Sequence, residues 1–204
     1  MKLEWSDKPR GKNCLHVAAL LRVIDPALQC ERKFEWLFVP RADERTEAEK
    51  KIFSSLRDHC RSTRHRHRVK ATCDPETMLS DSSIKGVARK LELDFFLPSF
   101  NKAIEFDERQ HFTEERHVTL ESYESIPLGF NKDRWIQLCS PSIQDPDPPC
   151  RDWMRAFRDA VRDIRLADHG VPLVRIYYRD FGLSECSAPG AIDRLRNIIG
   201  IEKN

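Results

Sequence analysis

The sequence contains no apolar run that approaches the roughly 20 residues a helix needs to cross a membrane. It also lacks internal repeats and long low-complexity segments. Residues 1–5 (MKLEW) carry an acid where a signal peptide would have its apolar stretch, so export is not expected. The 204 residues, 40% hydrophobic and 33% charged, are enough for one soluble domain with a substantial core. We expect a cytoplasmic protein without a membrane partner.

Cysteine pairs of the CxxC type are missing as well. The seven cysteines are odd in number and widely spaced, which indicates reduced thiols in a protein that is not exported. One mixed group has the side chains of a zinc site, but its spacing matches no common zinc pattern, and zinc is therefore the less favoured interpretation. Its members are Cys60, His65, His67 and Cys73.

Net charge says little about partners, because it is only +2. The distribution of charge says more, since residues 57–70 hold many basic side chains and a single acid, Asp58. Such a cluster suits phosphate contacts, and it suits a solvated loop or edge strand equally well. The candidates for nucleic-acid binding in this segment are Arg64, Arg66, Arg68 and Lys70.

Hydrophobic periodicity divides the chain into an accessory segment, residues 1–42, and a core, residues 43–204. The accessory segment has a strand at 34–39 and either a helix or a strand at 12–24. The core pattern predicts helices at 43–60, 151–168 and 189–199, and strands at 65–73, 90–97, 102–106 and 171–178. Residues 112–150, with four prolines between 140 and 149, are expected to form a loop-rich insertion. This order predicts an α/β fold with one central mixed sheet and helices on both faces.

The two strands at 90–97 and 102–106 carry acids among strongly apolar neighbours. A turn centred between Ser99 and Phe100 places Asp94 directly opposite Glu105, with the Cβ atoms about 5 Å apart. Asp107 shares a face with Glu105, because side chains alternate along a strand. Three converging carboxylates would suit Mg²⁺, whereas the alternative is an ordinary solvent-exposed acidic face. The apolar neighbours favour a functional site, because isolated acids are costly to bury.

Three further residues are candidates for the same site. Glu49 falls in the middle of the apolar stripe of the helix at 43–60, so it reaches either the helix edge or the carboxylate face of the sheet. His111 has the strand parity of Glu105 and Asp107, and Gln110 is adjacent. Either side chain could orient water or substrate, and a structural histidine is an equally good interpretation.

The stretch 91–112 (LELDFFLPSFNKAIEFDERQHF) resembles the PD-(D/E)xK nuclease superfamily. It is most similar to the branch with Glu-x-Asp followed by Gln-His, which includes relatives of very-short-patch-repair, restriction and phage endonucleases. Residues 47–52 resemble the first-helix motif of that superfamily, and residues 158–177 resemble its second core helix and the strand that follows. The resemblance implies a restriction-endonuclease-like αβββαβ core and hydrolysis of DNA with Mg²⁺, for which Mn²⁺ would substitute.

By this resemblance Asp94 and Glu105 would bind the metal, and Glu49 would assist. One departure is clear, because Asp107 stands where the superfamily has its lysine. Asp107 would then be a further ligand, with Gln110 or His111 in support. The group that activates the attacking water is left open.

The function expected is that of a Mg²⁺-dependent DNA endonuclease, with a homodimer as a possible assembly. Phosphate contacts are expected from Arg109, Lys132 and Arg134, while Tyr123, Phe130 and Trp135 would either stack on bases or, more in keeping with their type, pack in the core. The alternatives are a non-catalytic nucleic-acid-binding module and a nuclease subunit that needs a partner for cleavage.

Overall fold

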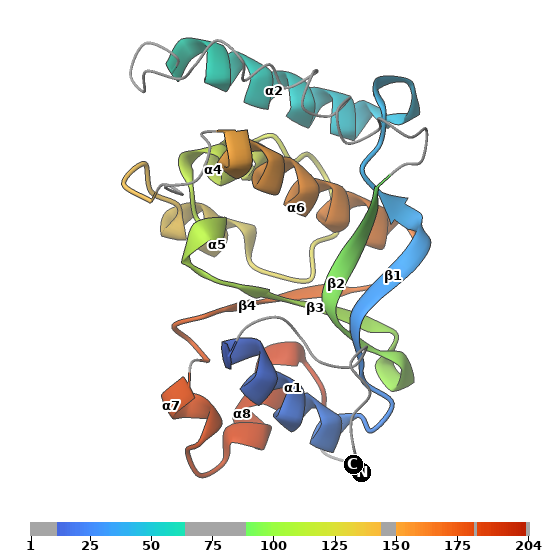
Figure 1. Ribbon diagram of the computed structural model, residues 1–204, viewed down its shortest axis with the longest axis vertical. Helices are drawn as coiled ribbons and strands as arrows, with labels where there is room; N and C mark the ends of the chain where they lie inside the picture. Colours follow the sequence, from blue (N-terminus) through green and yellow to red (C-terminus); the bar gives the residue numbers. More distant parts are fainter. Residues whose placement is uncertain (1–11, 64–88, 144–149, 182, 203–204) are drawn as a thin grey trace.

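A four-stranded sheet lies between two layers of helices in the computed structural model of the protein (Figure 1). The structure describes residues 12–63, 89–143, 150–181 and 183–202. The mixed α/β class with helices on both sheet faces is therefore confirmed. The predicted strand at 65–73, the basic residues Arg64, Arg66, Arg68 and Lys70, and three of the four zinc candidates lie outside the described residues.

The strands are β1 (Gln29–Phe38), β2 (Lys90–Leu97), β3 (Lys102–Asp107) and β4 (Leu173–Tyr177), in the spatial order β1-β2-β3-β4. Neighbours are antiparallel from β1 to β3, whereas β3 and β4 are parallel. A parallel pair needs a crossover connection. The helix of this crossover, α6 (Cys150–Asp168), lies against the sheet face that carries the acids.

The hairpin between β2 and β3 has the register that the sequence predicts. Phe95 pairs with Ile104, and Leu97 pairs with Lys102. The loop is longer than the two residues expected: Pro98–Phe100 form one turn of 3-10 helix, and Asn101 follows in the left-handed conformation with φ 45°. The longer loop keeps the same centre, so Asp94 and Glu105 are next to the last backbone pair, Phe95 and Ile104, where hydrogen bonds between side chains and backbone join the two strands.

The helices separate the apolar residues into two cores, one on each face of the sheet. Over the acidic face lie α4 (Glu114–Glu121), α5 (Lys132–Leu138) and α6, and α2 (Glu47–Thr63) packs on the outer side of α4 and α6. Against the other face pack α1 (Lys12–Ile24), α7 (Leu183–Cys186) and α8 (Ala191–Ile199). Within the described residues no helix is long and apolar enough to span a bilayer.

The structure gives more detail for two segments of the sequence analysis. The N-terminal segment, expected as an accessory layer, supplies an edge strand of the sheet, because β1 pairs with β2 and α1 packs beneath it. The insertion at 112–150 is not simply loop-rich, since it contains α4 and α5. Helix α4 escapes an apolar-periodicity analysis because its buried face includes Arg116 and Thr119.

Glu49 fixes α2 to α6. It is fully buried, and its Oε1 accepts a hydrogen bond from Arg165 Nε at 2.7 Å. Its Oε2 accepts the backbone N–H of Thr46, whose hydroxyl in turn accepts the backbone N–H of Glu49. This reciprocal arrangement is a capping box at the start of α2. Glu49 neither reaches the helix edge nor bonds to Asp94 or Glu105, so the geometry gives it a structural role.

The Glu49 contacts predict a large and local stability effect. In Glu49→Ala the buried Arg165 guanidinium loses its counter-charge, and we expect the free energy of unfolding to fall by about 3 kcal/mol or more. Glu47→Ala is the matched control, because Glu47 is exposed on the same helical turn and is expected to change stability by less than about 0.5 kcal/mol. Chemical denaturation of both variants makes the comparison, and equal midpoints would contradict the assigned role.

Candidate active site

Asp94 and Glu105 form the centre of the site. The backbone N–H of Phe106 donates to Asp94 Oδ2 at 2.8 Å, and the backbone N–H of Asp94 donates to Glu105 Oε1 at 3.2 Å. Each carboxylate thus accepts a hydrogen bond from a backbone N–H group of the other strand. Asp94 Oδ1 and Glu105 Oε2 have no hydrogen-bond partner among the described residues. Two carboxylates are therefore held side by side with one oxygen each left open.

The electrostatics of this pair are unbalanced. Glu105 is 3% exposed, and burial raises the pKa of its carboxyl to about 8, with the charge of Arg162 opposing the rise and that of Asp94 adding to it. Burial also raises the pKa of Asp94, against the backbone hydrogen bond from Phe106 and the charge of Arg162. The pair therefore has a strong tendency to hold a proton or to accept a cation.

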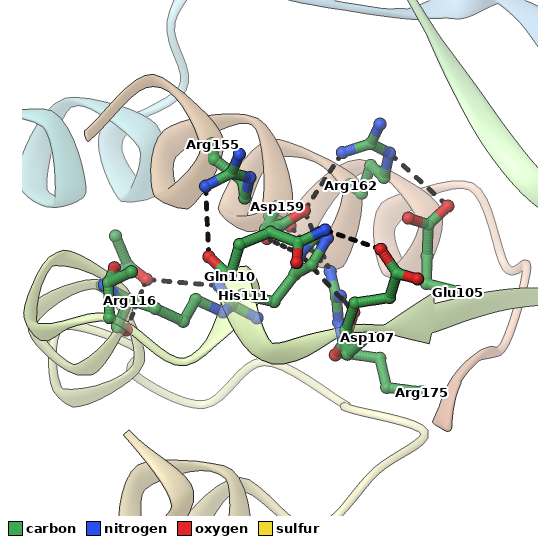
Figure 2. A network of polar contacts seen from close by, with 12 residues as sticks. Glu105, Asp107, Gln110, His111, Arg116, Arg155, Asp159, Arg162 and Arg175 are labelled. Atoms are coloured by element: carbon green, nitrogen blue, oxygen red, sulfur yellow. Dashed lines mark hydrogen bonds and ion pairs between the residues drawn. The ribbon is translucent and has the colours of Figure 1, made fainter. Parts of the chain in front are cut away.

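Arg162 is the cation next to the pair. Its Nε lies 3.6 Å from Glu105 Oε1, and its guanidinium also contacts Asp159 Oδ1 at 3.2 Å (Figure 2). Two hydrogen bonds to the carbonyl oxygen of Glu92, at 3.1 and 3.0 Å, fix its orientation. Because this single guanidinium is shared with Asp159, it does not neutralise both strand acids.

Asp107 has different hydrogen-bond partners from those of Asp94 and Glu105. Its Oδ1 accepts a hydrogen bond from Arg175 Nη1 at 2.7 Å, and its Oδ2 accepts one from Trp135 Nε1 at 2.7 Å. The expectation that Asp107 joins Asp94 and Glu105 as a third open carboxylate is corrected, because protein donors occupy both of its oxygens. In the part of the chain that the structure describes, no group of three or more histidine, cysteine, aspartate or glutamate side chains is arranged to hold a metal ion.

A buried ionic cluster extends from Asp107 beneath α6. Arg175, from β4, bonds to Asp163 Oδ1 at 2.9 Å in addition to Asp107. Asp163 also accepts hydrogen bonds from Arg116 Nη2 and from the Tyr123 hydroxyl, both at 2.6 Å. Sequence reasoning did not single out Arg116, Asp163 or Arg175 as site residues. One signal was present, namely an arginine in the middle of the apolar strand around 175.

His111 and Gln110 follow β3 on a single turn, η4 (Arg109–His111). His111 Nδ1 lies 2.8 Å from Asp159 Oδ2 and 3.7 Å from Asp107 Oδ1. Burial lowers the pKa of His111, but the two aspartates outweigh this and the net direction is upward. The Gln110 side chain turns to Glu108, to which it donates at 2.8 Å. His111 is thus joined to the site through Asp159, whereas the Gln110 side chain is directed to its own loop.

The remaining candidates are spread over the surface and the core. Arg109 and Arg134 are exposed, and Arg134 is paired with Asp180. Lys132 is half-buried at the start of α5. Tyr123 and Trp135 are 5% and 3% exposed, and Phe130 is half-buried against the same core, so packing is confirmed as the role of these aromatic side chains.

The donor set suits a divalent cation of the magnesium type. Mg²⁺ takes oxygen ligands and is commonly held by one or two carboxylates, with waters and substrate phosphates completing its shell. Asp94 Oδ1 and Glu105 Oε2 supply two such oxygens, and a bound cation would favour the ionised form of both carboxyls, whose pKa burial raises. Asp94 and Glu105 would therefore hold the ion, whereas Asp107 and Glu49 would not.

The raised pKa of Glu105 predicts a pH-dependent stability. The unfolded carboxyl loses its proton near pH 4.5 and the folded one near pH 8, so between these values the unfolded state binds fewer protons. In metal-free buffer the free energy of unfolding therefore falls as the pH rises through this window, by at most about 1.4 kcal/mol per pH unit.

Denaturation of the wild type and of Glu105→Gln across this range tests the expectation. The variant cannot titrate and should show a flatter profile. The folded pKa values of His111 and Asp94 are also raised, so both groups add a decline of the same sign above their ordinary pKa values in both proteins. The difference between the two profiles therefore reports the Glu105 carboxyl together with its coupling to Asp94. Parallel profiles would show that the carboxyl is ionised in the folded state.

Comparison of the chain with family models, with curated proteins and with solved structures gives no match.

Proposed function

We propose that the protein is a metal-dependent nuclease that hydrolyses phosphodiester bonds in DNA. The observation that carries the proposal is the pair Asp94 and Glu105, which lies next to the last backbone pair of β2 and β3 and is held there by hydrogen bonds from backbone N–H groups, with one open oxygen on each carboxylate. Glu105 is buried and Asp94 is half-buried, so the ionised form of both carboxyls together, with a single shared guanidinium nearby, is destabilising unless it binds something positive.

The topology supports a restriction-endonuclease-like core. If α1 is taken as the first helix, the order α1, β1, β2, β3, α6, β4 follows an αβββαβ pattern, with α2 inserted after β1 and with α4 and α5 inserted after β3. The first-helix motif expected at residues 47–52 then lies on the inserted α2 and not on the first helix of the pattern. In this arrangement the acids lie on the central strands, and the helix of the crossover packs behind them. The resemblance at residues 91–112 points to the same core.

Each residue of the site has a defined part in the proposed reaction. Asp94 and Glu105 would hold a Mg²⁺ or Mn²⁺ ion, which when bound lowers the pKa of water and neutralises charge on the phosphate. Arg162, on α6, holds positive charge beside Glu105, whereas the lysine of the superfamily would stand on β3, at the position of Asp107. His111, with its raised pKa and its bond to Asp159, keeps a proton near the site. A duplex cut on both strands would need two copies of this site, which favours a homodimer.

One observation favours the second candidate, a non-catalytic nucleic-acid-binding module. The position of the expected lysine is occupied by Asp107, and that side chain is committed to Arg175 and Trp135. In that case Asp94 and Glu105 would be retained without turnover. DNA binding without cleavage, in Mg²⁺ and in Mn²⁺, is the outcome that would decide for it.

Cleavage of supercoiled plasmid and of labelled duplex, single-stranded and mismatched oligonucleotides tests the nuclease proposal. We expect cleavage that requires Mg²⁺ or Mn²⁺. Asp94→Asn and Glu105→Gln should each lose on the order of 100-fold or more in rate, because a lost metal ligand removes several kcal/mol of transition-state stabilisation.

Glu35→Gln is the matched control, since Glu35 is an exposed strand acid on β1 that is paired with Lys90. It should cut at the wild-type rate. The proposal fails if the wild type cuts none of the substrates and calorimetry finds no Mg²⁺ binding. The assignment of the site fails if the wild type cuts and the Asp94 and Glu105 variants cut equally well.

A further inference from the structure

Three arginines follow one another along one face of α6. Arg155, Arg158 and Arg162 are separated by three and four residues, which places their side chains in a row on the helix surface. At 1.5 Å per residue the row extends for about 10 Å. It ends at Arg162, which lies 3.6 Å from Glu105, and the row therefore leads directly to the carboxylate pair.

The two outer arginines have protein partners. Arg155 Nη1 donates to Asp152 Oδ1 at 2.9 Å and to the carbonyl oxygen of Gln110 at 3.2 Å. Arg162 contacts Asp159, Glu105 and the carbonyl oxygen of Glu92. These bonds fix both guanidinium groups at the edge of the site, as Figure 2 shows for Arg155 and Arg162.

Arg158, between them, has no such partner. Its Nε is buried without a hydrogen-bond partner among the described residues, and none of their carboxylates is paired with it. Burial, together with the charges of Arg89 and Arg162, lowers the pKa of its guanidinium to about 10, against the opposing charge of Asp159. A half-buried cation among other cations is unfavourable, because the desolvated N–H and the like-charge repulsion both destabilise the folded chain.

We propose that Arg158, between Arg155 and Arg162, is a binding site for a phosphate group of a nucleic-acid strand that runs along α6 toward Asp94 and Glu105. The planar guanidinium matches a phosphate in shape and charge, and an anion would satisfy the buried Nε and relieve the repulsion at once. The inference deepens the proposed function, on which its choice of ligand rests.

Binding is measured separately from cleavage. Fluorescence anisotropy with a labelled DNA duplex and with its single strand, in EDTA, compares the wild type with Arg158→Gln over a series of salt concentrations. We expect affinity to fall roughly tenfold at low salt. The slope of log affinity against log salt should fall by about 1, as for the loss of one phosphate contact.

Arg196→Gln is the matched control. Arg196 lies on α8, on the opposite side of the sheet, and is paired with Asp193. Its removal lowers the net charge by the same amount and is expected to leave the slope unchanged. Arg158→Lys keeps the positive charge but loses the planar guanidinium that can donate two hydrogen bonds to one phosphate. Its DNA affinity should therefore lie between those of the wild type and Arg158→Gln.

Thermal unfolding without DNA gives a second readout. Because Arg158 is repelled by its neighbours in the free protein, Arg158→Gln should keep or raise the midpoint of unfolding at low salt, whereas loss of a structural arginine would lower it. Added sulfate should stabilise the wild type more than the variant.

The inference is overturned if Arg158→Gln binds DNA with the wild-type affinity and salt slope, or if it loses stability and no more affinity than Arg196→Gln loses. It is separable from the nuclease proposal. Weaker binding by Arg158→Gln in a protein that never cuts would support the site and refute the nuclease, and unchanged binding in a protein that cuts would do the reverse.

Discussion

The buried guanidinium of Arg175 is the contact on which the acidic face of the sheet depends. It joins β4 to Asp107 on β3 and to Asp163 on α6, and it also contacts the carbonyl oxygen of Asp159. Through Asp163 the same charge reaches Arg116 on α4, and through Asp107 it reaches Trp135 on α5. The guanidinium of Arg175 therefore connects β3 and β4 with the crossover helix α6 and with the helices α4 and α5 of the insertion. Without it several carboxylates would be buried without compensation, which commonly destabilises a fold by about 3–5 kcal/mol.

The charges that are balanced and those that are not lie in different places. Asp107 and Asp163 are saturated by arginine, tyrosine and tryptophan donors and serve the scaffold. Asp94 and Glu105 lack the positive charge that would let both ionise, so the pKa of each is raised, and the positive charge of Arg158 has no carboxylate partner among the described residues. A cation bound at the first and a phosphate bound at the second would relieve both. Natural proteins accept such local instability mainly where they bind or react.

The local sequence pattern was sufficient to predict much of the fold and the two acids at the centre of the site. The turn after Leu97 and the alternation on either side set the hairpin register, and an apolar stripe predicted α6. The role of Asp107 could not be predicted, because its partner Arg175 is 68 residues away and only the closed parallel pair brings them together. Glu49 was misplaced for the same reason, since Arg165 lies 116 residues further along the chain. Helix α4 was missed because Arg116 occupies a core position that periodicity assigns to an apolar side chain.

The wide separation of β3 and β4 in the chain has a consequence for how the site is assembled. The hairpin closes over 11 residues between Asp94 and Glu105, so it can form early and locally. The β3–β4 pairing has to wait until α6 and Arg175 have been made, and non-local pairing of this kind is slow. On a nascent chain the acids therefore exist before the arginine that orders their surroundings. The geometry of the site is completed only when the C-terminal strand docks, which ties competence for binding to the last stage of folding.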